Sequence, residues 1–233
     1  MKNIILSALL TGAMVTSAHA QIAAGTTMLG GNFTYWKSSN EVENSQLGYT
    51  SKTTNRQFNI NPVVGQFIAE NLAVGIQAMF SSTESKYHNP IFSSSTTFNG
   101  DYQDQIQKGR TLSVGPMLRY YKFVNEKAAF YGQVSMGYQN NYQSNYTSAF
   151  SNGGYSTPST SGSTRSEGFY GQVSPGFVFF PLDKLGLELA LQGISFGRVT
   201  DKNDAGKSVD TYLGAGFSLS NLQMGASFYL GRN

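Results

Sequence analysis

Few side chains beyond residue 20 could carry catalytic chemistry. His88 is the only histidine in that part of the chain, and the protein contains no cysteine. A histidine that serves as a hydrolase base needs a serine and an acid beside it, and no pattern in the sequence gathers such a set around His88. We therefore predict that His88 is solvated in a long loop, and that the protein uses no catalytic residue, no metal and no cofactor.

Three acids lie close to His88 in the sequence, namely Glu84, Asp101 and Asp104. Acidic side chains in a loop usually keep it soluble, and we expect that role here. Calcium binding is the alternative, because calcium prefers carboxylate oxygens as ligands.

Arg119 and Glu188 are the two charges that fall inside strongly alternating segments. Each belongs to the polar face of its segment, and each lies a few residues from a short turn. We predict that they form an ion pair at one depth inside a closed sheet, where either charge alone would be strongly destabilising. Bracing the interior is the expected role, and gating or proton passage is the alternative.

The first twenty residues have the organisation of a secretory signal peptide. Lys2 precedes an apolar run from Ile4 to Val15, and Ala18-His19-Ala20 matches the small-residue cleavage pattern. The run is shorter than the roughly 20 residues that a spanning helix needs. We therefore predict a signal peptide over 1–20 and a single domain over 21–233.

The composition restricts the possible partners. Charged residues make up only 12% of the chain, and the net charge of +3 is spread without a Lys/Arg run. A nucleic-acid-binding protein would show a basic patch or stripe, so we expect no nucleic-acid partner.

Alternation with a period of two dominates the chain from about residue 26, which favours β-strands. Leu185, Leu187 and Leu189 alternate with Gly186 and Glu188, for example. The pattern predicts eight strands, near residues 26–37, 55–69, 72–83, 109–123, 128–142, 168–181, 185–198 and 210–231.

The connections between these strands alternate in length. Three are tiny turns, at residues 69–71, 124–127 and 181–184. The others are long and polar, at residues 38–54, 84–108, 143–167 and 199–209. Short turns at one end and long loops at the other are typical of a transmembrane β-barrel, in which the short turns face the periplasm.

Two features complicate this assignment. Pro62, Pro116 and Pro175 each precede a short turn by about eight residues, and we predict bulges or kinks there because proline lacks a ladder donor. The apolar positions of the last segment change parity near Ser220. A hairpin there would give an odd strand count, so we favour one bulged strand.

The composition of the two strand faces predicts whether the outside of the barrel meets water or lipid. The less apolar face consists of Gly, Ser, Ala and Gln, which is too poor in charge for the surface of a soluble protein. It suits a narrow polar lumen, and the Leu/Val/Phe face would then meet lipid. A soluble lipocalin-like barrel is the less favoured alternative.

Aromatic side chains flank the short turns, as in YYKFVNEKAAFY at residues 120–131. Aromatic residues favour the depth where lipid headgroups meet hydrocarbon. We predict that Tyr120, Phe130, Phe179 and Phe228 are interfacial anchors that point outward, while Tyr121 and Tyr131 point into the lumen.

The end of the chain, QMGASFYL, is similar to the assembly signal of outer-membrane proteins in Gln223, Gly225, Phe228 and Leu230. With NPVVGQFIAENLAVGI, GPMLRYYKF and FVFFPLDKLGLELAL, it makes residues 25–231 resemble the small outer-membrane β-barrel family that includes OmpX-like proteins and the OmpA transmembrane domain. Many family members end on the aromatic residue, whereas Gly231-Arg232-Asn233 follow here.

The resemblance implies an all-β, eight-stranded antiparallel barrel in the bacterial outer membrane, inserted by the barrel-assembly machinery. We expect a monomeric, non-enzymatic structural component that contacts outer-membrane lipid. Its long loops contain Tyr49, Tyr87, Tyr142, Tyr146 and Tyr155, and they could bind a surface ligand in adhesion. The alternatives are a lipid-modifying enzyme similar to a lipid A deacylase, which would need His88, and a narrow channel.

Overall fold

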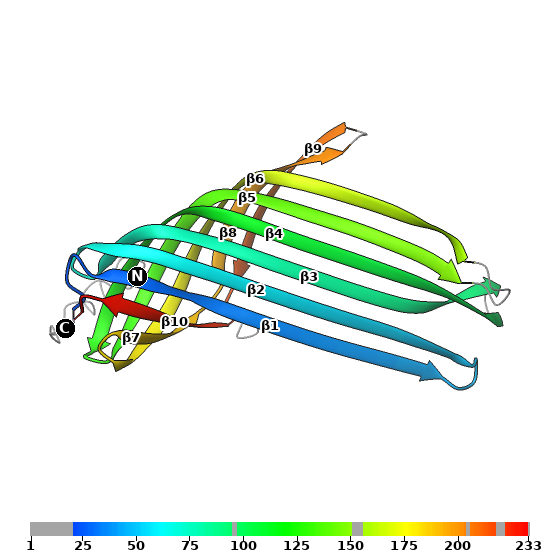
Figure 1. The fold of residues 1–233 in the computed structure, drawn as a ribbon, viewed down its shortest axis with the longest axis horizontal. Coiled ribbons are helices and arrows are strands. Elements are labelled where there is room, and N and C mark those ends of the chain that lie inside the picture. Colours follow the sequence, from blue (N-terminus) through cyan, green and yellow to red (C-terminus); the bar gives the residue numbers. More distant parts are fainter. Residues whose placement is uncertain (1–20, 95–96, 151–155, 204–205, 218–221, 233) are drawn as a thin grey trace, which may run out of the picture.

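A computed structural model describes residues 21–94, 97–150, 156–203, 206–217 and 222–232. The predicted signal peptide lies outside the described residues. Almost all of the described chain is β-strand (Figure 1), and no described helix is long and apolar enough to cross a membrane. The strands are β1 (Thr27–Asn44), β2 (Tyr49–Ala69), β3 (Leu72–Ser94), β4 (Thr97–Asn125), β5 (Ala128–Phe150), β6 (Ser156–Leu182), β7 (Leu185–Ala190), β8 (Gly193–Asn203), β9 (Gly206–Gly216) and β10 (Gln223–Leu230).

Eight of these strands close into a ring. Each strand from β1 to β6 pairs antiparallel with the next, β7 pairs with β10, and β10 also pairs with β1. Closure satisfies the backbone groups that an open sheet would expose. The predicted eight-stranded antiparallel barrel is thereby confirmed.

The strands are longer than the sequence pattern indicates. The three tiny turns lie where they were predicted, and both ends of the described chain lie at the same end of the barrel as these turns (Figure 1). At the opposite end, most residues of the predicted loops continue the ladders as hairpins. β4 and β5, for example, stay in register as far as Tyr102 and Phe150. The apolar alternation fades in these segments, but hydrogen bonding between strands does not require it.

The last two predicted strands are each divided, which the sequence analysis did not anticipate. β6 pairs with β7 near the short turns and with β8 farther along, so β7 and β8 share the flank of one long strand. β9 pairs with β8, whereas β10 returns to the ring. The prediction of one bulged strand over 210–231 is therefore wrong. The β8–β9 hairpin projects from the barrel (Figure 1).

The prediction of bulges at all three prolines is also largely wrong. The register is unchanged across Pro62 and across Pro116, although the ladder lacks two pairs on one side at each proline. Only Pro175 faces an irregularity, because the partner strand is interrupted opposite it and Leu191 donates its backbone N–H to the Pro175 carbonyl at 3.0 Å. A proline inside a strand can leave a carbonyl of the neighbouring strand without a donor while the register of the two strands is unchanged.

Candidate functional site

The Arg119 and Glu188 side chains meet inside the barrel, from β4 and β7. Arg119 Nη1 donates to Glu188 Oε1 at 2.9 Å and to Oε2 at 3.0 Å. The two residues are only 4% and 7% exposed. Inward alternation brings both side chains to the lumen, and their similar distance from the short turns gives them the same depth.

Other polar side chains form further hydrogen bonds with both members of the pair. Arg119 Nε donates to Gln133 Oε1 at 2.7 Å. Glu188 accepts from the Tyr131 hydroxyl at 3.2 Å, the Tyr229 hydroxyl at 3.2 Å and the Ser227 hydroxyl. Because a buried charge is stable only where it is paired and hydrogen-bonded, this arrangement suits a fixed structural brace.

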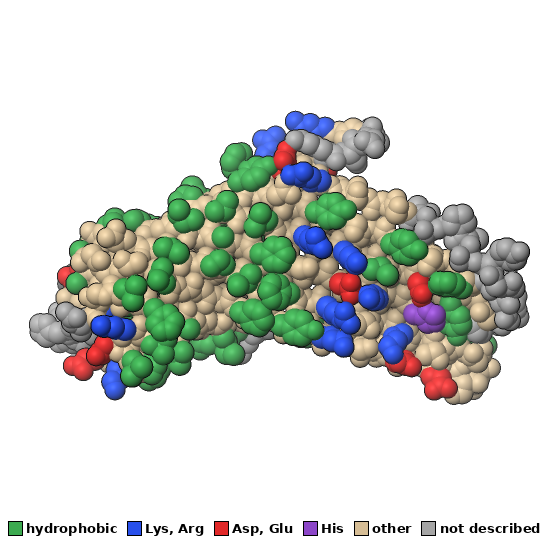
Figure 2. Space-filling view, viewed as in Figure 1, with side chains coloured by type: hydrophobic (Ala, Val, Ile, Leu, Met, Phe, Trp, Pro, Cys, Tyr) green, Lys and Arg blue, Asp and Glu red, His purple; other side chains and the backbone are tan. Residues whose placement is uncertain are grey.

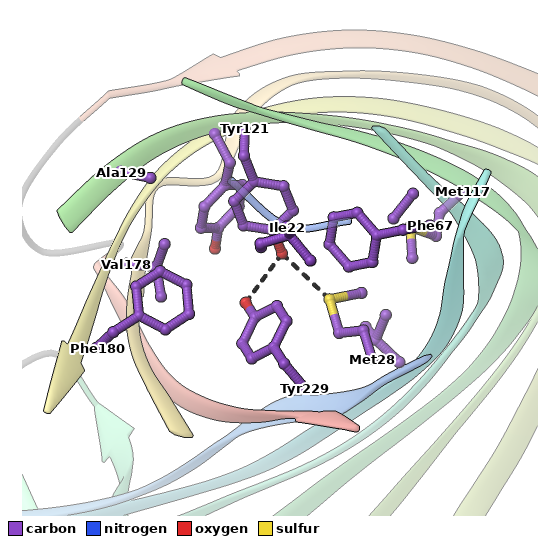
Figure 3. Close-up of a cluster of buried hydrophobic side chains, with 12 residues drawn as sticks. Ile22, Met28, Phe67, Met117, Tyr121, Ala129, Val178, Phe180 and Tyr229 are labelled. Atoms are coloured by element: carbon purple, nitrogen blue, oxygen red, sulfur yellow. Dashed lines mark hydrogen bonds between the residues drawn. The ribbon is translucent and has the colours of Figure 1, made fainter. Parts of the chain in front are cut away.

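An apolar layer fills the barrel between this network and the short turns (Figure 3). Its largest fully buried members include Tyr121, Tyr229, Phe67, Ile22 and Met28. The Tyr121 hydroxyl lies 3.0 Å from the Tyr229 hydroxyl and donates to the Met28 sulfur at 3.1 Å, which links the apolar layer to the network above it.

Both ends of the described chain fold over this mouth of the barrel. Ile22 is held by paired bonds with Asn71, since its N–H donates to Asn71 Oδ1 and its carbonyl accepts from the Asn71 N–H, both at 3.0 Å. The Arg232 guanidinium lies 3.8 Å from the centre of the Phe180 ring and donates to the Asp183 carbonyl at 3.2 Å. Ile22 and Arg232 thus cover the mouth.

A polar vestibule of about 650 Å³ opens on the other side of the network. Its lining comes from the inward faces of β3 to β6 and of the β8–β9 hairpin, and includes Ser81, Thr83, Gln139, Asn141, Asp201 and Asp210. This lining can accept water or a small polar molecule. The network and the apolar layer separate the vestibule from the short-turn mouth.

His88 lies within β3, so the prediction that it lies in a loop is wrong. Its Nδ1 is 2.5 Å from Asp104 Oδ1, and its ring stacks on Tyr102 with centroids 4.4 Å apart. The Glu84 carboxylate contacts Arg56 and Lys108 and not Asp104. Within the described ranges, no three His, Asp or Glu side chains are gathered in a way that could hold a metal ion.

The outer surface of the barrel carries a broad apolar band (Figure 2). Large apolar side chains on every ring strand are exposed there, including Leu118, Val134 and Ile76. From Ile68 to the aromatic Phe58 along β2, ten residues of tilted strand give the band a height of about 26 Å. A continuous apolar surface of this size does not face water in monomeric proteins, whereas it matches the hydrocarbon of a bilayer. The fold is an eight-stranded transmembrane β-barrel.

The predicted interfacial aromatics all lie on this outer surface near the short-turn end. Tyr120, Phe130, Phe179 and Phe228 are exposed, whereas Tyr121 and Tyr131 are buried in the lumen. A headgroup-level role for the four outward rings stays a prediction.

The four residues of the predicted assembly signal lie on β10, which closes the ring against β1. Gln223 accepts from Asn32 Nδ2 at 2.9 Å. A side chain at Gly225 would approach the Gly31 carbonyl oxygen of β1 to 2.5 Å. Phe228 and Leu230 point outward and are exposed. These positions therefore shape the seam between the first and last strands, and their recognition during assembly stays a prediction.

Comparisons with known proteins give matches only at the level of solved structures. No family model matches the chain, and no curated protein matches it. Ail, the attachment invasion locus protein of Yersinia pestis, is 17% identical with a TM-score of 0.33, over 89% of this chain and 99% of that one. The outer membrane protein OprG of Pseudomonas aeruginosa is 15% identical with a TM-score of 0.38, over 89% of this chain and 97% of that one.

Sequence reasoning missed the residues that close the short-turn mouth and those that line the vestibule. Ile22 and Arg232 lie outside any alternating segment, so no periodic signal marked them. The vestibule residues are inward positions of segments that were predicted to be loops. Extending the alternation through Ser, Thr and Tyr, which are compatible with strands, would have found the latter.

Proposed function

We propose that this protein is a monomeric, non-enzymatic component of the bacterial outer membrane, exported by the signal peptide at residues 1–20 and inserted by the barrel-assembly machinery through Gln223, Gly225, Phe228 and Leu230. Its short turns face the periplasm, and its long hairpins extend from the cell. The proposal rests chiefly on the closed lumen, in which the buried Arg119–Glu188 pair lies above an apolar layer.

Electrical recording tests the closed lumen directly. The purified protein in planar bilayers should give no steady conductance of general-porin size, since the side chains at the short-turn end fill the ring. A variant that shortens two of the filling side chains, Tyr121→Ala with Tyr229→Ala, should conduct more than the parent if it folds. Open-pore conductance from the parent itself would contradict the proposal and favour a channel.

The long hairpins support a second part of the proposal, which is binding to a surface partner. The β5–β6 hairpin carries exposed Tyr142, Tyr146 and Phe150 beyond the apolar band. Aromatic and small polar side chains on a rigid support make adaptable contacts.

Shortening one hairpin tests this part. Ser144 and Ser163 are paired, so replacing residues 145–162 with an Asn-Gly turn should leave the ladder below intact. Cells that display the shortened protein should adhere less to host-cell surfaces or extracellular matrix than cells that display equal amounts of the parent. Equal adhesion of parent, shortened protein and barrel-free cells would remove the adhesive role.

The contact between His88 and Asp104 is the observation that favours an enzymatic alternative, a lipid-modifying hydrolase. A carboxylate can orient a histidine base, but among the described residues no serine hydroxyl bonds to this ring. We expect the parent protein and His88→Ala to leave the acyl chains of outer-membrane lipid equally intact. Acyl release that depends on His88 would reverse this conclusion.

A further inference from the structure

Four charged residues form a row across the outer surface of β1 to β4. Lys37 pairs in register with Arg56, Arg56 with Glu84, and Glu84 with Lys108. Paired residues in a sheet point to the same face, and this face continues the exposed apolar positions below. Lys86, two residues beyond Glu84, points the same way. We call Lys37, Arg56, Lys86 and Lys108, grouped around Glu84, the cationic row.

The cationic row has more positive charge than its own acid can neutralise. Glu84 lies 3.4 Å from Arg56 Nη1, 3.4 Å from Lys86 Nζ and 3.9 Å from Lys108 Nζ. Its side chain is 24% exposed, whereas those of Arg56, Lys86 and Lys108 are 47%, 46% and 54% exposed. The Glu84 carboxylate is thus partly covered, whereas the three cations around it remain about half exposed and can bind another anion. Figure 2 shows basic side chains gathered where the apolar band ends.

The next charged row along the same strands has no excess of positive charge. Glu41 pairs in register with Lys52, Lys52 with His88, and His88 with Asp104. Lys52 Nζ donates to Glu41 Oε2 at 2.8 Å, and this bond lowers the pKa of the Glu41 carboxyl. The excess positive charge on β1 to β4 therefore does not extend into this next row.

The height of the cationic row matches the layer of lipid headgroups. Phe33, Phe58 and Phe80 form an aromatic belt, with ring centroids 5.4 Å and 6.1 Å apart. Arg56 is two residues beyond Phe58, which corresponds to about 7 Å along the strand or about 5 Å along the barrel axis. The headgroup layer on each side of a bilayer is roughly 5–7 Å thick. A phosphate in that layer would lie level with the row.

We propose that the cationic row is a binding site for the phosphate groups of outer-leaflet lipid. Arginine and lysine are the side chains that bind phosphate, arginine through a planar fork and lysine as a mobile point charge. The ligand is a membrane lipid because the row faces outward directly above the apolar band. This inference rests on the proposed membrane position, and it names the lipid chemistry that the barrel recognises there.

Lipid binding to the purified protein tests the site. The protein in uncharged detergent is titrated with a glycolipid that carries two phosphates on its sugar headgroup, and bound lipid is counted by native mass spectrometry. The parent should bind it more tightly than the same glycolipid without phosphates. Arg56→Gln with Lys108→Gln should weaken binding on the order of tenfold. Glu84→Gln should strengthen it, because the competing carboxylate is gone.

A matched control removes the same charge elsewhere. Lys122 and Lys127 are exposed at the short-turn end, and Lys122→Gln with Lys127→Gln should bind the phosphorylated glycolipid as the parent does. Equal loss in this control, equal binding of both glycolipids, or weaker binding by Glu84→Gln would overturn the proposal. Displacement of the lipid by millimolar inorganic phosphate would point instead to a site for free anions.

Flotation with lipid vesicles separates this inference from the proposed function. If every variant floats with the vesicles and none distinguishes the two glycolipids, the phosphate site is wrong and the membrane position stands. A parent protein that does not float would contradict the proposed function itself.

Discussion

At the scale of single residues, Arg119 shows how a charge is held inside this barrel. Its guanidinium donates to Glu188, Gln133 and the Tyr121 hydroxyl, and it lies 4.4 Å from the centre of the Tyr131 ring. Glu188 accepts from three further hydroxyl groups. Removing one member of the pair would therefore leave the other charged, buried and only partly satisfied.

A double-mutant cycle should reveal this dependence. Arg119→Met and Glu188→Leu should each lower the free energy of unfolding by about 3–5 kcal/mol, because each leaves one buried charge unpaired. The double variant should lose less than the sum of the two. Urea-induced unfolding in lipid vesicles measures all four proteins. The exposed Lys52–Glu41 pair is the control and should show little coupling, and additive losses at 119 and 188 would argue against the brace.

The sequence could predict this contact because alternation determines the face of a strand and distance from a turn determines depth. Face and depth can both be predicted from the local sequence, and both were predicted in this way for Arg119 and Glu188. The cationic row could not be predicted in the same way. It depends on the register between β1, β2, β3 and β4, and Glu84, Lys86 and Lys108 lie in a segment that was expected to be a loop. Ile22 and Arg232 were missed because they cover the mouth from outside any strand.

At the scale of elements, β4 and β5 approach closely where Gly115 faces Gly137. A methyl group at Gly137 would overlap the Val114 carbonyl oxygen, and one at Gly115 would overlap the Met136 carbonyl oxygen. The missing side chains thus allow the two backbones to pack together. Because the register is continuous on both sides of this point, neither strand can shift to make room.

Alanine substitutions should separate this packing role from strand propensity. Gly137→Ala should destabilise the barrel by about 1–3 kcal/mol through overpacking. Gly132→Ala in the same strand meets no atom within 4 Å, and it should be neutral or slightly stabilising. Thermal unfolding in detergent, followed by the mobility shift of folded barrels on gels, compares the two variants. Equal effects of the two substitutions would mean that the close approach of β4 and β5 is not the reason for glycine at position 137.

The divided strands predict a difference in stability along the chain. β7 pairs with β6 and β10, whereas β9 pairs among the described residues only with β8. Hydrogen exchange of the intact protein should therefore protect amides in Leu185–Ala190 more than those in Gly206–Gly216, because an edge strand opens locally at lower free energy. Equal protection would indicate that β9 pairs with another segment in the membrane.

The sequence did predict the number of ring strands and the three tiny turns, because each turn separates two strongly alternating segments. It did not predict how far the strands extend past the bilayer. Beyond about Phe58 the outward positions lose their apolar character, since they no longer need to match lipid. The alternation on which the prediction relied therefore ends near the membrane boundary while the hydrogen-bonded ladder continues.

At the scale of the whole molecule, the apolar outer face of the barrel predicts that it lies in a membrane. Val64 and Ile76 are paired across β2 and β3 near the middle of the band, and both are exposed. In a soluble barrel, arginine at such a position would cost little, since exposed surface substitutions rarely matter. In lipid, arginine near the bilayer midplane costs roughly 2–4 kcal/mol.

Ile76→Arg should therefore reduce the free energy of folding into lipid vesicles by that amount. Tyr146→Arg, on the outer face beyond the aromatic belt, is the matched control and should change stability little, because its side chain meets water. Both variants are compared with the parent by reversible urea titration in vesicles of one lipid. A cost at position 76 alone is expected if the band is buried in hydrocarbon. A neutral effect at both positions would place the apolar band in water and contradict the transmembrane fold.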